Sequence, residues 1–298
     1  EHFMKEKKKR ILWVLFLVLM GFVLLPVFLY LTFPYDQLNE FITKQTEPYL
    51  PGFDLSIGRI RPYRLTGFEI KNILIQKSEG EKGASAPILN LQKLRFRCEI
   101  LPLVARTIRI PLSSRLYKGT LDGRVARKSE DYTISAEMKE VDLAAYLPLK
   151  EIFGISIGGI VSGKTSLKLP DSNPAKLNGT IDLSVKDITV GESTVHGFTL
   201  PAIQADQLNG RILLANGKGT FKDCVLTSSD LEGELTGNIF LSNRIERSTL
   251  KLNLKFKLSG DLQKNFGSLL AAIRKPDSSG YYNLSIIGTL SNPRMNLR

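Results

Sequence analysis

Strict alternation of apolar and polar side chains over ten residues is the feature that most limits what this chain can fold into. In Thr249–Leu258 every second residue is Leu or Phe, and the residues between them are Lys, Asn or Thr. A period of two separates the two sets onto opposite faces of a β-strand, whereas a helix would mix them. The segment is therefore predicted to be a strand with one apolar and one hydrated face, which is typical of antiparallel sheets.

Shorter runs with the same period recur in the second half of the chain, and turn sequences separate them. The runs cover residues 181–185, 208–214, 231–241 and 282–290. Glycines near the starts of these runs, in segments such as LNGTIDL and LNGRILL, are typical of bulges and bends in a curved sheet. We therefore predict a mainly β chain whose curved antiparallel sheet either closes as a sandwich or stays open as a groove.

Three segments have the period of a helix. Residues 34–50 are predicted to form a short amphipathic helix, capped by Asp36, in which Leu38, Phe41 and Ile42 share one face. The other two helical segments are residues 141–153 and 262–273. We expect these two helices to cover the ends of the sheet.

The segment GGIVSGKTS at residues 158–166 matches the phosphate-loop motif of nucleotide-binding proteins. That loop binds phosphate only where a helix starts directly after the Lys, because backbone amides at a helix N-terminus hold the phosphate groups. Here Thr165 continues an alternating run that ends at Pro170, so a helix is not expected. We predict instead that Lys164 lies on the hydrated face of a glycine-rich strand.

A second motif, GISIG at residues 154–158, matches the turn that carries the nucleophile of serine hydrolases. Ser156 is followed by predicted strand rather than helix, and nothing in the spacing places it near His196 and either Asp171 or Asp182. The sequence also lacks the paired His or spaced Cys residues of a metal site. No catalytic residue, cofactor site or metal site is predicted, and we expect the protein not to be an enzyme.

A stretch without any charged side chain covers residues 11–33, directly after the basic cluster KEKKKR. Roughly 20 apolar residues are enough to cross the hydrocarbon core of a bilayer. The stretch is longer than the apolar core of a cleavable signal, and no cleavage site follows it. We therefore predict a cytoplasmic stub at residues 1–10, an uncleaved membrane anchor at residues 11–33 and translocation of residues 51–298 across the membrane.

The chain has a formal net charge of +12 at pH 7, which the basic cluster explains only in part. Rows of cations alternate along two predicted strands, namely Lys93, Arg95 and Arg97, and Lys251, Lys255 and Lys257. Such rows are typical of hydrated strand faces, which they protect from edge-to-edge association. Contact with anionic lipid head groups or with an acidic partner is the functional alternative. Because the domain is expected to be translocated, nucleic acid is not expected as a partner.

The two cysteines, Cys98 and Cys224, lie in different halves of the chain. A single pair does not indicate a disulfide framework, so their pairing is left open. Cys98 continues the alternating run of Leu94 and Phe96 towards Ile100, and it is therefore predicted to be a small buried apolar side chain.

The order of several motifs along the chain resembles a known family. After the anchor and the short helix come GFDLSIGRIRPYRLTGFEIKNILI from residue 52, LPLVARTIRI from residue 101, GGIVSGKTSLKL from residue 158 and GYYNLSIIGTLSNPRMNLR from residue 280. In this order they are similar to AsmA-like proteins of the Gram-negative envelope, and within that group to the type II secretion system protein N family. Together with the anchor, these motifs span nearly the whole chain.

The resemblance implies a single-pass inner-membrane protein with a β-rich periplasmic domain. It implies a non-enzymatic structural or accessory role in type II secretion, with other subunits of that system as partners. Residues 281–290 are a candidate edge strand for such a partner. The alternative is an AsmA-like protein that binds or transfers lipid, in which Leu252 and Leu254 contact acyl chains. For a body of this length a packed core is the default, and it is favoured over a lipid groove.

Overall fold

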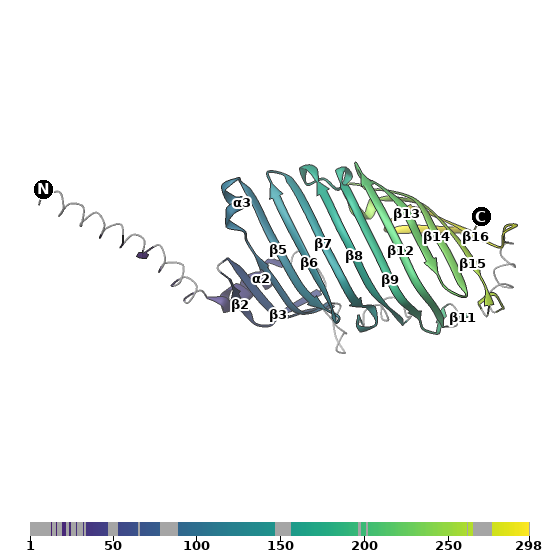
Figure 1. The fold of residues 1–298 in the computed structure, drawn as a ribbon, viewed down its shortest axis with the longest axis horizontal. Coiled ribbons are helices and arrows are strands. Elements are labelled where there is room, and N and C mark those ends of the chain that lie inside the picture. Colours follow the sequence, from purple (N-terminus) through teal and green to yellow (C-terminus); the bar gives the residue numbers. More distant parts are fainter. Residues whose placement is uncertain are drawn as a thin grey trace, which may run out of the picture.

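The structure is a computed structural model, shown in Figure 1. It describes residues 34–46, 53–77 except 65, 89–146, 156–260 except 196, 197 and 201, 262–264 and 276–297, together with seven separate residues between 13 and 32. No helix in this part of the chain is long and apolar enough to cross a membrane. The anchor predicted at residues 11–33 lies largely outside the described residues.

A single antiparallel sheet of 15 strands dominates the molecule. The strands are β1 (Phe53–Ile57), β2 (Ile60–Tyr63), β3 (Gly67–Lys77), β4 (Leu89–Arg97), β5 (Thr107–Leu116), β6 (Gly119–Lys128), β7 (Asp131–Asp142), β8 (Ile157–Leu169), β9 (Asn178–Val190), β12 (Ile203–Ala215), β13 (Lys218–Thr227), β14 (Leu231–Phe240), β15 (Thr249–Leu258), β16 (Tyr282–Thr289) and β17 (Asn292–Leu297). A separate hairpin is made by β10 (Ser193–Val195) and β11 (Phe198–Leu200). From β3 onwards each strand of the large sheet pairs with the next one along the chain, and only this hairpin is skipped.

The alternating segments predicted from sequence form strands, and the segment Thr249–Leu258 is β15 with the same bounds. Asn216 and Gly217 form the turn between β12 and β13, with φ angles of 48° and 73°. Two positive φ values in succession are typical of the two-residue turn that best matches the twist of a hairpin. The mainly β fold expected from the period-two pattern is therefore confirmed.

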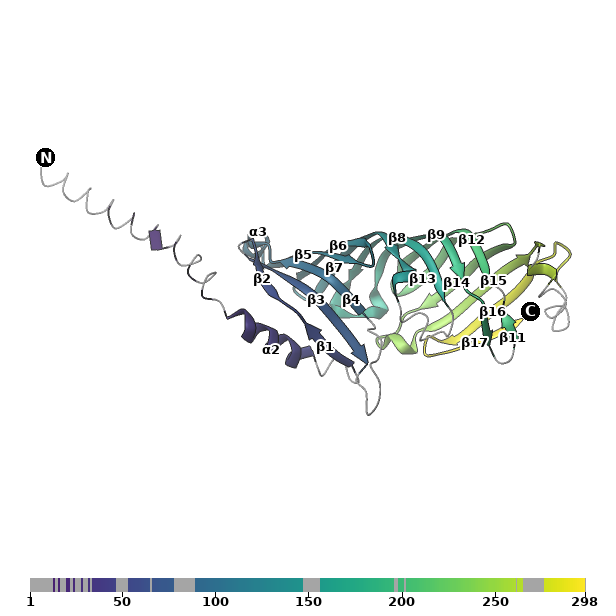
Figure 2. The same ribbon diagram turned by 90° about the horizontal axis from the view of Figure 1, so that it is seen from below.

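The sheet is curved along its length, so that β16 and β17 turn back behind β13 and β14 (Figures 1 and 2). Glycines lie opposite large side chains on its concave side; for example, Gly179 pairs with Leu167 and Leu214 in the neighbouring strands. Side chains on the inside of a bend are crowded, and glycine removes one of each facing pair. The glycine motifs of the sequence thus lie where the sheet needs room to curve.

The core is not that of a sandwich. Among the described residues the buried side chains form two small clusters, one around Ile60, Ile70 and Ile73 and one around Val141, Val161 and Val185. No second sheet of comparable size covers the first in this part of the chain. The packed core favoured from chain length was therefore the wrong alternative, because the length is used to extend one layer rather than to build two.

Helix α2 (Tyr35–Thr46) confirms the helix predicted after the anchor segment, but it begins before Asp36, which was predicted to cap it. Leu38 and Ile42 pack against the cluster around Ile60, so this helix covers the first strands of the sheet. Phe41, which was predicted to share that face, is instead 60% exposed.

The other helical predictions are met only in part. Val141 is still in strand β7, and a 3-10 turn follows at Leu143–Ala145, capped by the Asp142 carboxylate. Residues 147–155 lie outside the described residues. Of the segment 262–273 only residues 262–264 are described, and they are helical.

A five-residue helix that was not predicted, α3 (Ile100–Val104), connects β4 to β5. It ends the alternating run, because β4 stops at Arg97 and leaves Cys98 outside the strand and Ile100 59% exposed. Cys98 is only partly buried, so the prediction of a buried strand residue was wrong.

The prediction that residues 281–290 form an edge strand was wrong. The main part of this segment is β16, which pairs with β15 on one side and β17 on the other. The strand at one end of the sheet is β17. At the opposite end, β1 and β2 pair with successive parts of β3, one after the other along its edge. Pro293 is compatible with this position, because an end strand tolerates a residue without an amide donor.

Candidate functional site

The two faces of the large sheet differ in chemistry. One register row on the concave side crosses eleven strands, from β5 to β17. Its members are Leu112, Gly123, Ala136, Thr165, Ile181, Ile212, Phe221, Gly237, Leu252, Ile286 and Met295. The row contains no charged residue, and Thr165 is its only residue with a polar side chain. We call this side of the sheet the apolar face.

A second row lies one pair along the strands and has the same character. It consists of Ile110, Val125, Ile134, Leu167, Gly179, Leu214, Gly219, Ile239, Leu250, Gly288 and Pro293. Because successive strands stay in register, the rows form a continuous apolar surface rather than isolated patches.

Much of the apolar face is only half-buried. Ile181, Ile212, Phe221 and Leu252 retain part of their exposure although they lie in the middle of the sheet, and Leu183 is 39% exposed. A side chain in a packed core is almost completely removed from water, and such residues normally touch many neighbours. The apolar face therefore offers a long surface on which a ligand could replace water.

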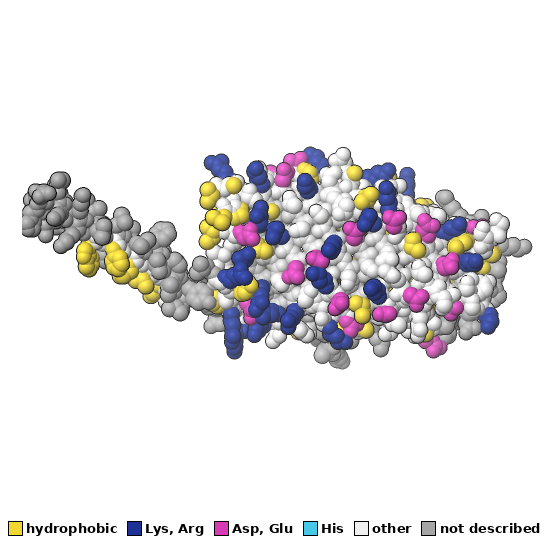
Figure 3. All heavy atoms as spheres, viewed as in Figure 1, with side chains coloured by type: hydrophobic (Ala, Val, Ile, Leu, Met, Phe, Trp, Pro, Cys, Tyr) yellow, Lys and Arg dark blue, Asp and Glu magenta, His cyan; other side chains and the backbone are white. Residues whose placement is uncertain are grey.

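The opposite, convex side carries charges of both signs and is the side seen in Figure 3. A row there consists of Ser113, Asp122, Glu137, Lys164, Asp182, Arg211 and Lys222. A shallow depression on this charged face is lined by Glu137, Lys164, Asp182 and Arg211. These groups pair with one another, Lys164 with Glu137 at 3.2 Å and Arg211 with Asp182, so the depression is largely compensated in charge.

The segment GGIVSGKTS is part of strand β8, as predicted. Lys164 is 73% exposed on the charged face. Its ammonium group pairs with the Glu137 carboxylate, which also contacts Lys139 at 3.4 Å. Hydrogen bonding from Lys164 lowers the pKa of Glu137. A short 3-10 turn follows the strand instead of the helix that a phosphate loop requires.

The residues of the hypothetical hydrolase triad lie far apart along β8. Ser156 precedes this 13-residue strand and Asp171 follows it, which separates them by roughly 40 Å at the rise of an extended chain. Asp182 pairs with Lys164, eight residues along the strand from Ser156, and it is bound by Arg211. His196 is outside the described residues. Neither Asp171 nor Asp182 lies within hydrogen-bond reach of Ser156 or of a base placed beside it, so neither can complete a catalytic triad with that serine.

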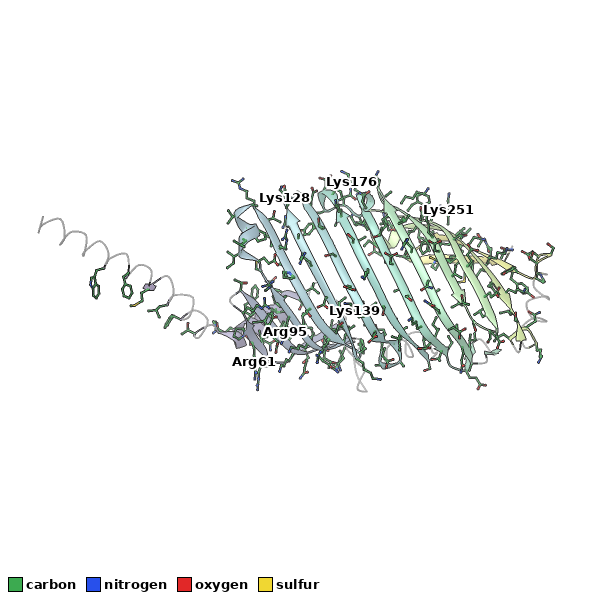
Figure 4. All side chains as sticks on the ribbon, in the orientation of Figure 1. Arg61, Arg95, Lys128, Lys139, Lys176 and Lys251 are labelled. Atoms are coloured by element: carbon green, nitrogen blue, oxygen red, sulfur yellow. The ribbon has the colours of Figure 1, made fainter. Side chains whose placement is uncertain are left out.

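The cations of β4 form a cluster around one carboxylate. Glu69 is 13% exposed and contacts Arg95 at 2.7 Å, Lys93 at 3.1 Å and Lys71 at 3.9 Å. The hydrogen bond from Arg95 is the main reason that the pKa of Glu69 is lowered. The Arg95 guanidinium also lies 4.8 Å from the centre of the Tyr63 ring. Figure 4 shows Arg61 and Arg95 at the same end of the sheet.

The cations of β15 have different partners. Lys255 lies 4.0 Å from Asp277 and 4.4 Å from the centre of the Tyr281 ring, and Lys257 approaches the same ring at 5.7 Å. Both rows therefore lie on the charged face, as the alternating pattern predicted. The positive charge of each row is partly compensated by a nearby carboxylate, Glu69 for β4 and Asp277 for β15.

The net charge is distributed unevenly along the sheet. Residues 53–128, which form β1 to β6, contain 16 Lys and Arg against 6 Asp and Glu, a net charge of +10. Residues 129–298 contain 19 against 18, a net charge of +1. Almost the whole net charge of the chain therefore lies in residues 53–128, the segment of the first six strands. Simple counting along the sequence would have revealed this difference, which the overall charge conceals.

Neither cysteine forms a disulfide. Cys224 is buried on the apolar face beside Gly210, and burial raises the pKa of its thiol. The described residues contain no group of three His, Cys, Asp or Glu side chains that would hold a metal ion.

Comparisons with known proteins do not add to this description. The sequence matches no protein-family model, no curated protein and no solved structure. The apolar face is therefore the candidate functional site on the strength of its own geometry and chemistry.

Proposed function

We propose that this protein binds the acyl chains of membrane lipid along the apolar face of its sheet, without catalysing a reaction. The observation that carries the proposal is the half-buried state of rows of Leu, Ile and Phe that stay in register across eleven strands. Exposed apolar surface on this scale is uncommon in soluble domains unless it binds something.

An acyl chain fits the chemistry of this surface. Each methylene group that leaves water contributes roughly 0.8 kcal/mol, whatever its position along the chain. A surface made of aliphatic side chains and glycines offers no fixed polar group to orient a ligand, so it suits flexible apolar chains better than small polar metabolites. The charged face on the other side keeps the domain in water while the apolar face is occupied.

The proposal agrees with what the AsmA-like resemblance implies. In that interpretation residues 11–33 anchor the protein in the inner membrane and the sheet extends into the periplasm. Lipid from the membrane would then reach the apolar face without passing through water. The ligand proposed is therefore a phospholipid.

A photo-crosslinking residue on β15 tests the proposal directly. Leu252 lies on the apolar face and Asn253, the next residue, on the charged face. In cells, a crosslinker at residue 252 should capture phospholipid, identified by mass spectrometry, and a crosslinker at residue 253 should not. Equal capture at both positions, or at neither, would contradict the proposal.

Charge on the apolar face provides a second test. Leu252→Asp and Leu254→Asp should remove copurifying phospholipid, because a carboxylate cannot be placed against acyl chains without a large desolvation cost. Asn253→Asp is the matched control, since it adds the same charge to the same strand on the charged face, and it should leave bound lipid unchanged. Circular dichroism of the three variants would separate loss of lipid from loss of fold.

A second candidate function is the one implied by the narrower resemblance, a partner-binding component of type II secretion. The end strand β17 favours it, because residues 292–296 are exposed and only β16 pairs with them in the described sheet. A strand of another subunit would extend the sheet there. A crosslinker at Asn296 should then capture an identified secretion subunit, and deletion of the gene should impair secretion; a normal secretome with no captured subunit would exclude this role.

A further inference from the structure

The helix α3 exposes four large aliphatic side chains at one rim of the sheet. Leu101 and Val104 are 86% and 87% exposed, and Ile100 and Leu103 are 59% and 43% exposed. Figure 3 shows apolar side chains gathered at the end of the sheet where Figure 1 places α3. Isolated exposed aliphatic residues are ordinary on protein surfaces, but four within five consecutive residues form a patch.

The base of α3 is fixed to the sheet, so the patch has a defined position. Glu99, which precedes the helix, contacts Arg97 at 3.6 Å and Arg109 at 3.5 Å, and its amide donates to the carbonyl of Arg109 at 2.9 Å. The amides of Ala105 and Arg106 donate to Pro102 and Leu103, which closes the turn. These contacts hold the ends of the segment and leave its aliphatic side chains pointing away from the sheet.

Two exposed cations lie beside the patch. Arg106 and Lys128 are exposed beside it, with Lys128 directly opposite Thr107 at the start of β5, and neither forms an ion pair with any described residue. They belong to the segment 53–128, which carries a net charge of +10. Aliphatic side chains flanked by Lys and Arg suit the interface of an anionic bilayer, where the apolar groups enter the acyl boundary and the cations contact head groups.

The position of α3 in the molecule agrees with a membrane contact. Helices α2 and α3 lie at the same end of the long sheet in both ribbon views (Figures 1 and 2). Helix α2 begins at Tyr35, two residues after the last residue of the predicted anchor. A bilayer holding that anchor would therefore be close to this end of the sheet.

We propose that α3 inserts its aliphatic side chains into the interface of an anionic phospholipid bilayer while Arg106 and Lys128 contact the lipid phosphates. Ile108, 44% exposed and one pair along β5 from Ile110, continues the apolar surface from α3 to the apolar face. Insertion would thus place the beginning of the apolar face at the membrane. The contact itself does not depend on lipid being bound along the sheet.

Environment-sensitive fluorescence of the full chain in nanodiscs tests the insertion. In a background with Cys98→Ser and Cys224→Ala, a single Cys carries the fluorophore, either at Leu101 or, as a control, at Asn243 in the exposed loop between β14 and β15. In nanodiscs of phosphatidylcholine with phosphatidylglycerol, the label at residue 101 should shift its emission to the blue and be quenched by nitroxides on the acyl chains. The label at residue 243 should do neither.

Charge reversal tests the role of the cations. Arg106→Glu and Lys128→Glu should each weaken the preference for phosphatidylglycerol over pure phosphatidylcholine by at least about fivefold, since losing one cation near an anionic surface already costs on the order of 1 kcal/mol and the new carboxylate adds repulsion. Lys139→Glu and Lys251→Glu, on the nearly neutral part of the sheet, are the matched controls and should have little effect. All four side chains are exposed, so these variants are expected to fold.

Several results would overturn the proposal. A label at residue 101 that stays in water in anionic nanodiscs excludes insertion. A label at residue 101 that is shielded in nanodiscs but is not quenched by the acyl-chain nitroxides points to a protein contact instead. An equal response in both lipid compositions removes the role assigned to Arg106 and Lys128. None of these outcomes affects the crosslinking test at Leu252, so the insertion and the lipid-binding proposal can fail separately.

Discussion

The two parts of the sheet, β1 to β6 and β7 to β17, consist of the same kind of strand but differ in the residues that distinguish them. In β1 to β6 the distinctive residues are cations, which give residues 53–128 a net charge of +10. In β7 to β17 the charges balance, and the distinctive residues are glycines on the apolar face. All seven glycines with positive φ among the described residues lie in this second part. Under the two proposals made above, the first part contacts an anionic surface and the second curves around an apolar ligand.

The largest difference between the two parts should appear when a glycine of the apolar face is replaced. Gly237 has a φ of +122°, and a Cβ there would lie against the carbonyl oxygen of Lys251, well inside van der Waals contact. Gly237→Ala should therefore lower the free energy of unfolding by about 3–4 kcal/mol, as measured by urea denaturation.

The matched control is on the same strand and the same face. At Gly233 the nearest atom to an added Cβ is the Leu226 Cβ at 3.6 Å, an ordinary contact. Gly233→Ala should change the free energy of unfolding by less than about 1 kcal/mol. Equal losses in the two variants would show that the curvature does not depend on the conformation at Gly237.

In the first part, the carboxylate that compensates several cations should matter most. Glu69→Gln leaves Lys93 and Arg95 without their shared partner, and we expect a loss of about 1–2 kcal/mol in denaturation at pH 7. Since the folded-state pKa of Glu69 lies below its ordinary value of 4.5, its contribution is present above that value and is lost as the pH falls through the lowered pKa. The wild type and the variant should therefore become equally stable in acid, and a difference that persists there would contradict this role for Glu69.

The alkylation rates of the two cysteine thiols should differ between the two parts of the molecule. Cys98 is partly exposed beyond the end of β4, whereas Cys224 is buried on the apolar face with its pKa raised. Alkylation of the native protein, followed by mass spectrometry, should modify Cys98 at least about tenfold faster than Cys224. In denaturant the two rates should converge, and a fast Cys224 in the native protein would mean that the apolar face opens readily to water.

The smallest effect is expected at Lys164, despite its place in the phosphate-loop motif. Its ion pair with Glu137 is exposed, and pairs of this kind often contribute nothing measurable to stability. Lys164→Ala should leave the denaturation midpoint unchanged, and neither protein should bind ATP in equilibrium dialysis. ATP binding that disappears in the variant would contradict the interpretation of this segment as an ordinary strand.

Period and glycine placement were sufficient to predict much of the sheet. The bounds of β15 and the strand nature of the GGIVSGKTS segment follow from which residues are large at every second position, a local property that the sequence states directly. The turn at Asn216 and Gly217 was equally predictable, because few residue pairs adopt two positive φ angles.

Features that depend on distant contacts were not predicted. The same alternation serves a sandwich and an open sheet, since both need one apolar face on each strand, so length favoured the wrong alternative. The run from Leu94 to Ile100 keeps its period after β4 has ended, and the pattern alone does not show that Arg109 binds Glu99 and turns the chain there. Phe41 is exposed although it lies next to Ile42 in α2, because only Leu38 and Ile42 of the predicted face pack against the cluster around Ile60.

The neighbour-to-neighbour order of the strands makes this sheet nearly one-dimensional. Each strand from β3 to β9 and from β12 to β17 packs mainly against the strands before and after it, so the structure can grow in sequence order. At a spacing of about 4.8 Å per strand, the path from β1 to β17 measures roughly 60 Å, and each added hairpin would lengthen it by about 10 Å. Hairpins are also the unit in which strands can be gained or lost while the direction of the remaining chain is kept. The length of the apolar face is thus fixed by the number of hairpins that the gene encodes.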